Sequence, residues 1–333
     1  MKVLVTGAAG FIGSAVSAKL KAQGHEVLGL DSISDYYDQN LKRMRIAHFL
    51  TQNQIEFEEV DIALLDQFQE VYRRFNPDAV IHLAAQAGVR TPNATLTNYV
   101  GANLVGFTNV LQTVVESSTP IFLYASSSSV YGNNSTAPYS ENEKNLNPTS
   151  FYGATKLANE IFAKSVLTTS STKVAGMRFF TVYGPWGRPD MAYFRILTSV
   201  LTREKFKLFG DGSIKRDFTY IDDTVLGIVA LLDNASKIET GNPEIFNIGG
   251  GKPASIRELI REIEGIAGSA VKQIAMSEIS GDVRETIANP VKLQEFTGFT
   301  PQISLEKGLK LFYSWATQEE IAPRLQEWVS STP

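Results

Sequence analysis

The chain lacks cysteine and has little histidine. Its 333 residues include no cysteine, which excludes disulfide bonds and thiolate chemistry but leaves the cellular compartment open. The three histidines, His25, His48 and His82, show no metal-ligand spacing, so we expect no catalytic metal. His82 precedes Leu83 in an apolar segment, where a packed and hydrogen-bonded core histidine is a better interpretation than a catalytic one.

Long apolar runs and a large charge excess are absent too. No apolar run approaches the about 18 residues that indicate a membrane-spanning helix. The first expected strand starts at Val3, almost at the initiator Met, so there is no room for a signal peptide and we expect a cytoplasmic protein. The formal net charge of −4 argues against nucleic acid or an anionic membrane as a partner. The one tight basic cluster near the start, Lys42, Arg43 and Arg45, is interpreted as a solvated helix face.

Short β-branched runs alternate with helical patterns in the first half of the chain. This alternation predicts an α/β fold in which a doubly wound parallel sheet is covered by helices on both faces. The expected strands are residues 3–6, 26–31, 57–61, 79–84, 121–126 and 173–180.

Beyond about residue 181 the alternation loosens and glycine-rich turn signals appear. We therefore expect residues 1–180 to form the doubly wound domain and residues 181–330 to form most of a smaller α/β lobe that closes over a substrate. Residues 244–248 have the composition of another buried strand, which could rejoin the main sheet. With 43% hydrophobic residues, the chain can bury a large core.

A glycine-rich loop follows the first strand and opens an apolar-periodic helix. Gly7, Gly10 and Gly13 have the spacing G-x-x-G-x-x-G. Glycines allow a pyrophosphate to approach the backbone, and the helix N-terminus offers it unpaired N–H groups and a positive dipole. Asp31 ends the second strand, where its carboxylate can accept hydrogen bonds from ribose hydroxyls and would repel a 2′-phosphate. The pattern predicts NAD rather than NADP, and a turn-capping Asp is the alternative.

Two further motifs carry groups suited to proton transfer. Tyr152 and Lys156 form a Tyr-x-x-x-Lys pattern, which places both side chains on one face of a helix, one turn apart. Alone this pattern is weak, because the chain has 12 tyrosines. Residues 126–132 add a run of serines at the carboxyl end of an expected strand, where doubly wound folds bind ligands.

Together these motifs resemble the extended short-chain dehydrogenase/reductase family over nearly the whole chain. The resemblance implies that Tyr152 is the catalytic acid/base and that Lys156 binds the nicotinamide ribose and lowers the Tyr152 pKa. It also implies that Ser127 hydrogen-bonds the reacting oxygen, with Ser128 as a further catalytic and substrate contact. Ser32 stands where relatives often carry Asn. The implied NAD contacts are Gly7, Gly10, Phe11, Ile12, Gly13, Asp31, Ser32, Lys42, Asp61, Ile62, Leu83, Ala84, Ala85, Asn103, Ser126, Tyr152 and Lys156.

The residues after Ser127 separate the reactions of this family. Ser128 and Ser129 stand where sugar 4,6-dehydratases carry an Asp-Glu pair and uronate decarboxylases usually carry a Glu, and this favours an epimerase. The most similar members are UDP-glucuronate 4-epimerases, on the strength of the motifs at 35–38, 86–90 and 184–192. The implied reaction begins when Tyr152 takes the proton from the sugar O4 while hydride passes from C4 to NAD. The 4-keto sugar then turns and receives hydride on its other face.

A 4-keto uronate is a β-keto acid, which loses carbon dioxide when its carboxylate rotates into line with the ketone π system. We expect Arg188 to hold that carboxylate, because a guanidinium fork matches a carboxylate in a fixed plane. A solvated loop residue is the alternative for Arg188 and equally for Arg90. Arg216 and Arg284 match diphosphate contacts of relatives, but could instead pair with Asp217 or Asp282 on the surface. The implied substrate contacts are Arg90, Ser127, Ser128, Tyr152, Thr181, Arg188, Ala192, Arg216 and Arg284.

Other functions remain open at this point. The sugar could be neutral or N-acetylated, and the reaction could be a decarboxylation. The same Ser-Tyr-Lys set would support a reductase or dehydrogenase that releases its reduced cofactor, and a catalytically silent nucleotide sensor is a third class. Family members usually dimerise through two helices of each subunit, here residues 99–116 and 152–169, so we expect a homodimer.

Overall fold

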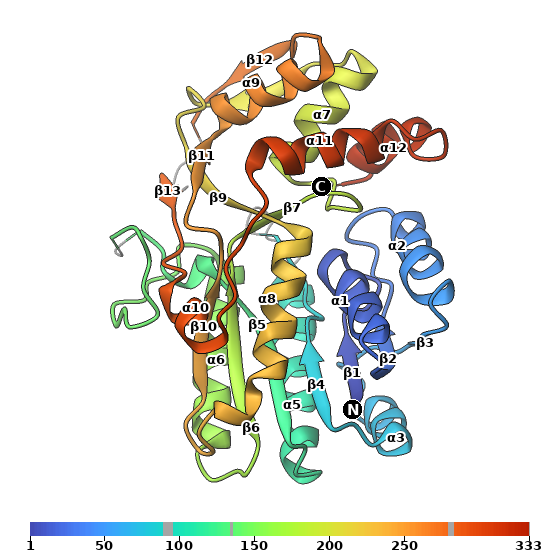
Figure 1. Ribbon diagram of the computed structural model, residues 1–333, viewed down its shortest axis with the longest axis vertical. Helices are drawn as coiled ribbons and strands as arrows, with labels where there is room; N and C mark the ends of the chain where they lie inside the picture. Colours follow the sequence, from blue (N-terminus) through green and yellow to red (C-terminus); the bar gives the residue numbers. More distant parts are fainter. Residues whose placement is uncertain (89–95, 134–135, 279–282, 333) are drawn as a thin grey trace.

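The computed structural model describes residues 1–88, 96–133, 136–278 and 283–332. Its central sheet has seven strands in the order β10-β6-β5-β4-β1-β2-β3, and every neighbouring pair runs parallel (Figure 1). This confirms the doubly wound α/β fold predicted from the sequence. The strands are β1 (Lys2–Thr6), β2 (Glu26–Asp31), β3 (Glu56–Glu59), β4 (Ala79–His82), β5 (Ile121–Ser127), β6 (Lys173–Phe179) and β10 (Glu244–Ile248).

Alternate residues of the inner strands face different helices, which is why β1 and β4 are almost entirely apolar, whereas the edge strand β3 is rich in Glu and partly exposed. Val3 and Val5 belong to the core on one face of the sheet, whereas Leu4 belongs to the core on the other. The first face is covered by α1 (Phe11–Ala22) and α8 (Ile221–Asp233), which contact each other. The second face is covered by α3 (Leu65–Phe75), α5 (Phe107–Glu116) and α6 (Phe151–Leu167).

Two helical segments include π-helical turns. The helix α4 (Leu96–Tyr99) continues through η3 (Val100–Gly106) into α5, so the predicted helix at 99–116 is one continuous element. Near the start of the chain, α2 (Gln39–Arg45) continues into η1 (Ile46–Thr51).

A second group of elements lies beyond the carboxyl ends of the main strands, at the top of Figure 1. Its four-stranded sheet has β9 (Lys215–Tyr220) at the centre, paired with β7 (Thr181–Tyr183), β11 (Pro253–Ser255) and β13 (Glu285–Thr286). A short parallel pair joins β8 (Phe206–Phe209) to β12 (Gln273–Met276). The helices of this group are α7 (Ala192–Thr202), α9 (Ile256–Ala267), α11 (Leu305–Ala316) and α12 (Leu325–Ser330).

The chain returns to the main sheet after entering the second group. The segment expected to rejoin that sheet is β10, which pairs in parallel with β6. In addition, α8 packs on α1, and α10 (Val291–Thr297) packs on β10 and α8. We propose a division into lobes near residue 180, with these three later elements belonging to the first lobe.

His82 ends β4 inside the core and is 1% exposed. Its Nδ1 shares a hydrogen bond with the Thr6 hydroxyl at 2.8 Å, and burial lowers its pKa to about 3, so the ring is neutral. The interpretation of His82 as a packed, hydrogen-bonded core residue is therefore confirmed. Within the described residues, no helix is both long and apolar enough to cross a membrane. No three acidic or histidine side chains of that part of the chain are grouped to hold a metal ion.

Candidate active site

The glycine loop lies where β1 and β4 diverge, at the point where the strand order reverses. Gly7 has a φ of +74°, and a Cβ atom there would lie 2.7 Å from the Ala84 amide nitrogen. A Cβ at Gly13 would lie 2.1 Å from the Gly7 carbonyl oxygen, so the start of α1 touches the loop directly. Gly10, the N-cap of α1, has no side chain to cap the helix. The N–H groups of the first turn are therefore left for a ligand such as a pyrophosphate, which fits the predicted NAD.

The carboxylate of Asp31 borders the glycine loop. Its Oδ2 accepts a hydrogen bond from the Ala9 amide at 3.2 Å, and its Oδ1 accepts one from the Ile33 amide at 2.8 Å. Asp31 therefore caps the turn after β2 and also faces the loop that would hold the cofactor. Lys42 lies beside the same turn, with Nζ donating to the Ser34 hydroxyl at 2.8 Å, and it is buried.

The residues expected to surround the adenine end of NAD follow β2 and β3. Ser32 is exposed directly after Asp31. Asp61 accepts a hydrogen bond from the Ala63 amide at 2.9 Å, and Asn109 donates to the Ile62 carbonyl oxygen at 2.9 Å. These bonds fix the turn that carries Asp61 and Ile62 against the helix α5.

Asn103 anchors the segment after β4. Its Oδ1 accepts from the Gln86 amide at 2.8 Å, and its Nδ2 donates to the Gln86 carbonyl oxygen and to the Thr155 hydroxyl, both at 3.0 Å. The side chain is 1% exposed, so its amide group is committed to these partners. Asn103 thereby ties residues 83–85, which border the glycine loop, to the helix that carries Tyr152.

The structure separates the two serines at the end of β5. Ser126 points into the core, where its hydroxyl donates to Glu160 at 2.5 Å, and Glu160 forms a buried bidentate pair with Arg178. Its hydroxyl is thus part of a structural network. Ser127 instead shares a hydrogen bond with Tyr152, and its Oγ also accepts from the Ser129 amide at 3.1 Å.

Two predicted groups, Ser127 and Arg188, therefore act on the hydroxyl of Tyr152. Burial raises the Tyr152 pKa, while the positive charge of Arg188 and the hydrogen bond with Ser127 lower it. The sequence had assigned the lowering to Lys156. In the structure, Lys156 is 1% exposed and donates to the Ala125 carbonyl oxygen at 3.0 Å, with Nζ 6.0 Å from the centre of the Tyr152 ring. Burial lowers the Lys156 pKa to about 8.

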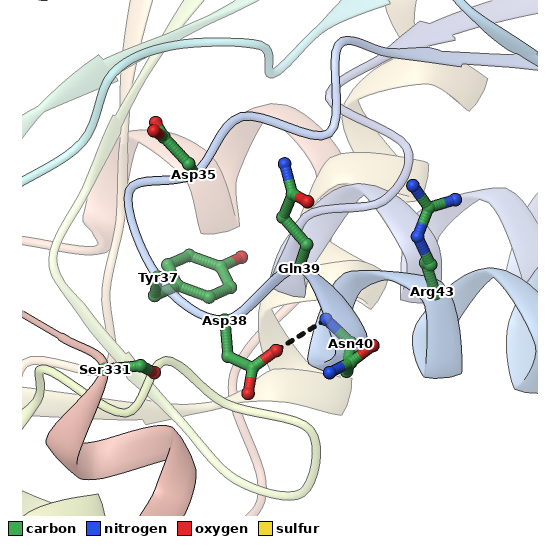
Figure 2. Close-up of a pocket in the computed structure, with 7 residues that line it drawn as sticks. All are labelled: Asp35, Tyr37, Asp38, Gln39, Asn40, Arg43 and Ser331. Atoms are coloured by element: carbon green, nitrogen blue, oxygen red, sulfur yellow. Dashed lines mark hydrogen bonds between the residues drawn. The ribbon is translucent and has the colours of Figure 1, made fainter.

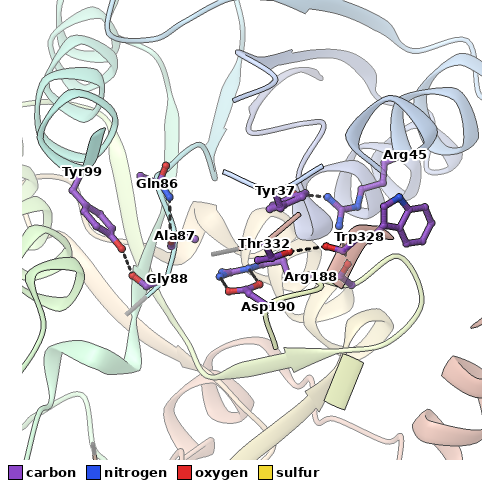
Figure 3. Close-up of polar contacts among 11 residues, drawn as sticks. Tyr37, Arg45, Gln86, Ala87, Gly88, Tyr99, Arg188, Asp190, Trp328 and Thr332 are labelled. Carbon is purple, nitrogen blue, oxygen red and sulfur yellow. Dashed lines mark hydrogen bonds and ion pairs between the residues drawn. The ribbon is translucent and has the colours of Figure 1, made fainter. Parts of the chain in front are cut away.

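Arg188 is held beside this site by a neighbour that the sequence did not indicate. Its Nε and Nη2 donate to the two carboxylate oxygens of Asp190 at 3.0 and 2.5 Å (Figure 3). Burial alone would lower the Arg188 pKa, but the charge and hydrogen bonds of Asp190 outweigh it and raise that pKa. The guanidinium carbon also lies 6.0 Å from the centre of the Tyr36 ring. Arg188 is therefore a partly buried, fully charged group and not a solvated loop residue.

Two more tyrosines complete the surroundings. The Tyr99 ring lies 6.3 Å from that of Tyr152, and its hydroxyl donates to the Gly88 carbonyl oxygen at 2.5 Å (Figure 3). Burial raises the pKa of Tyr36 to about 12, with Asp190 adding to the rise and Arg188 opposing it. In the sequence, Tyr36 stands out only as part of the motif at residues 35–38, and no pattern singles out Tyr99.

The remaining predicted substrate contacts lie on separate elements. Thr181 begins β7, Ala192 begins α7 and Ser128 begins the turn after β5, and all three are partly exposed. The side chain of Arg284 is exposed, and Arg216 is half-buried on β9. Arg90 and Asp282 lie outside the described residues.

The position of Asp217 rules out one alternative for Arg216, a surface ion pair between the two. It is fully buried, and its carboxylate accepts hydrogen bonds from the amides of Gly250, Gly251 and Ala288 at 2.8–3.0 Å. A surface ion pair between Arg216 and Asp217 is therefore wrong, because the Asp217 carboxylate is enclosed by backbone amides.

The interpretation of residues 42–45 as a solvated face is also wrong. Only Arg43 is exposed, whereas Lys42 and Arg45 are buried, and Arg45 has no exposed surface. The spacing in the sequence could have indicated this, because Leu41 and Arg45 are four residues apart and so share one helix face. In the structure Leu41 is fully buried on that face.

The loop at residues 35–38 also borders a hollow on the outer surface. The hollow has a volume of about 300 Å³ and is lined by polar groups, with Ser331 of the C-terminal segment opposite Asp38 (Figure 2). The Asp38 carboxylate accepts from the Asn40 amide at 2.7 Å and so begins α2. Neither Tyr152 nor Arg188 is among the lining residues, so this hollow is separate from the site around Tyr152.

Comparison with known proteins identifies the family. Residues 3–249 match the model of the NAD dependent epimerase/dehydratase family. The chain belongs to this family. Its curated relatives include UDP-glucuronate 4-epimerase 4 of Arabidopsis thaliana, 42% identical over 94% of this chain and 74% of that protein, and protein CapI of Staphylococcus aureus, 38% identical over 95% and 98%.

A solved structure extends this likeness to three dimensions. The UDP-glucuronic acid 4-epimerase of Bacillus cereus, in complex with UDP-glucuronic acid and NAD, has a TM-score of 0.88 and 35% identity and covers 95% of this chain and 98% of its own. NAD is accordingly the cofactor of this chain, and we propose that the glycine loop and Asp31 bind it.

The close contact of Gly13 with Gly7 gives a test of the cofactor site. In a Gly13→Ala variant the new Cβ must displace the loop, so we expect stability to fall by roughly 1–3 kcal/mol and NAD binding to weaken by at least about tenfold. The measurement is the NAD released per chain on denaturation, together with the melting temperature. Gly265→Ala in α9 is the control, because a Cβ there meets no atom within 4 Å. Wild-type NAD content in Gly13→Ala would contradict the assignment.

Proposed function

We propose that the chain is an NAD-dependent UDP-sugar 4-epimerase that interconverts UDP-glucuronate and UDP-galacturonate. The observation that carries the proposal is that the positive charge of Arg188 and a hydrogen bond with Ser127 both act on Tyr152, in surroundings where Arg188 lies over the Tyr36 ring and Tyr99 lies beside Tyr152. A proton-transfer group and a carboxylate-binding group side by side suit a uronic acid better than a neutral sugar. Relatives named UDP-glucuronate 4-epimerase support the same substrate.

Proton transfer at the sugar O4 is assigned to Tyr152. Bound NAD supplies the hydride acceptor and donor at C4. Ser127 donates a hydrogen bond to the reacting oxygen, while the charge of Arg188 and the hydrogen bond of Ser127 counteract the effect of burial on the Tyr152 pKa. Lys156, whose Nζ donates to the Ala125 carbonyl oxygen and lies 6.0 Å from the centre of the Tyr152 ring, is assigned to bind the nicotinamide ribose.

Retention of the carboxylate is assigned to Arg188. The Asp190 carboxylate accepts from Nε and Nη2 of Arg188, and the other N–H groups of the guanidinium remain as donors for a sugar carboxylate. Because Asp190 fixes the plane of the guanidinium, it also fixes the plane of a carboxylate bound there. Such a carboxylate cannot rotate freely into the geometry that releases carbon dioxide from the 4-keto intermediate.

We also propose a homodimer. Apolar side chains that lie at least one-third exposed gather on the adjoining segments α4, η3 and α6. These are Leu96, Val100, Val105, Phe151, Ile161, Phe162 and Val166. Two copies of such a face could bury each other about a twofold axis.

The catalytic role of Tyr152 predicts the effect of removing one oxygen atom. A Tyr152→Phe variant should lose turnover by roughly 10² to 10⁴, because no other acid/base takes the O4 proton, and should keep its NAD and its melting temperature. The rate of UDP-galacturonate formation from UDP-glucuronate measures this. Tyr313→Phe on α11 is the control and should retain the wild-type rate. A Tyr152→Phe rate within a few-fold of wild type would mean that another group is the base.

The role of Arg188 predicts a change in products. An Arg188→Met variant should bind UDP-glucuronate more weakly and should release some UDP-pentose, because the carboxylate is then free to rotate. The double variant with Arg188→Met and Asp190→Asn should give the same products. It avoids leaving the Asp190 carboxylate without its partner Arg188. Chromatography of the nucleotide sugars is the measurement, with Arg261→Met as the exposed control. Unchanged KM and UDP-galacturonate as the sole product would rule out the carboxylate contact.

The proposed dimer is tested by its mass. Light scattering should give twice the chain mass for the wild type, and Ile161→Glu, which places a charge on the most exposed of these residues, should give the monomer mass. Leu311→Glu on α11 is the control, because Leu311 is also exposed but lies outside these segments, and it should remain dimeric. A wild-type monomer at micromolar concentration would refute the proposal.

A further inference from the structure

Arg45, at the end of α2, is an always-charged side chain with no exposed surface. Its Nε donates to the Trp186 carbonyl oxygen and its Nη2 to the Gly187 carbonyl oxygen, both at 2.9 Å. Its Nη1 donates to the Tyr37 hydroxyl at 2.5 Å and reaches the Ala9 carbonyl oxygen at 3.4 Å (Figure 3). Its partners are thus neutral oxygens, which satisfy the buried charge by hydrogen bonding.

These partners belong to three segments that are distant in sequence. Ala9 lies in the glycine loop, Tyr37 lies in the 35–38 motif, and Trp186 and Gly187 directly precede Arg188. Arg45 therefore connects the NAD loop to the backbone that carries the proposed carboxylate contact. A purely apolar side chain would fill the same space without joining these segments.

The backbone turn that Arg45 contacts includes a residue in a strained conformation. Trp186 has a φ of +63°, a left-handed conformation that costs energy for a large residue. Its indole is 7% exposed and stacks on His48 with ring centres 4.9 Å apart, and it also contacts Trp315 at 5.4 Å. The aromatic contacts hold the side chain, and the two hydrogen bonds from Arg45 hold the carbonyl groups of Trp186 and Gly187.

We propose that Arg45 is a positioning residue: it fixes the turn at Trp186 and Gly187 and thereby sets the place of Arg188 relative to the NAD loop. The role rests on the proposed function in one respect, the contact between Arg188 and a sugar carboxylate. Positioning errors of about 1 Å cost up to about 10² in rate. Loss of Arg45 should therefore change how the carboxylate is held, although Arg45 does not touch it.

The test uses Arg45→Lys, which keeps the charge but removes the fork, and Tyr37→Phe, which removes one hydrogen bond and keeps the ring. Arg43→Lys is the matched control, since Arg43 lies on the same helix and is exposed. Two properties are measured: the ratio of UDP-pentose to UDP-galacturonate formed from UDP-glucuronate, and the acrylamide quenching of tryptophan fluorescence. All three tryptophans, Trp186, Trp315 and Trp328, are buried, so quenching reports release of the turn without any substrate.

We expect Arg45→Lys to raise the pentose fraction and the KM by about tenfold each and to increase quenching, with kcat less affected. Tyr37→Phe should change both properties in the same direction but less, and it covers the case in which Arg45→Lys does not fold. Wild-type product ratio and quenching in both variants, with Arg43→Lys also normal, would overturn the positioning role.

The two proposals fail differently. If Arg188→Met alters the products but the Arg45 and Tyr37 variants do not, only the positioning role is wrong. If the wild type does not epimerise UDP-glucuronate while the variants still increase quenching, the proposed function is wrong and the structural part of the positioning role stands.

Discussion

The site depends on the close approach of three backbone segments at the switch point of the sheet. Gly7 lies against Ala84, and Gly13 lies against Gly7, with no space for a Cβ atom at either glycine. This contact brings the end of β1, the end of β4 and the start of α1 to one place, which is where the first-turn N–H groups of α1 can meet a pyrophosphate. Asn103 then ties the segment after β4 to the helix of Tyr152. Backbone packing and the side chain of Asn103 thereby fix the glycine loop relative to the helix that carries Tyr152.

Two arginines near the site have different surroundings. Arg188 is partly exposed, is paired with Asp190 and lowers the Tyr152 pKa, and we propose that it contacts the substrate. Arg45 is fully buried, donates to carbonyl groups and belongs to the support of the loop. An epimerase acting on a uronic acid needs both properties, because the 4-keto intermediate must be reduced before its carboxylate reaches the geometry for decarboxylation.

The sequence predicted the elements whose signal is local. The strands appeared as apolar runs because both faces of the sheet are covered, and the glycine loop appeared because only glycine fits its contacts. Residues whose partners are distant in the chain were misread. Arg45 looked solvated because its carbonyl partners lie 141 and 142 residues away, and Asp217 looked like a surface partner because the amides it binds lie 33 to 71 residues away. Backbone partners of this kind leave no pattern in the sequence.

The most direct measurement is incubation of the purified protein with UDP-glucuronate and no added NAD, followed by separation of the nucleotide sugars. The account predicts UDP-galacturonate as the product, with no net absorbance of reduced cofactor, because the hydride is returned within each cycle. Substantial UDP-xylose would contradict the proposed control of the carboxylate. Absence of any conversion, with NAD bound and the protein folded, would contradict the substrate assignment.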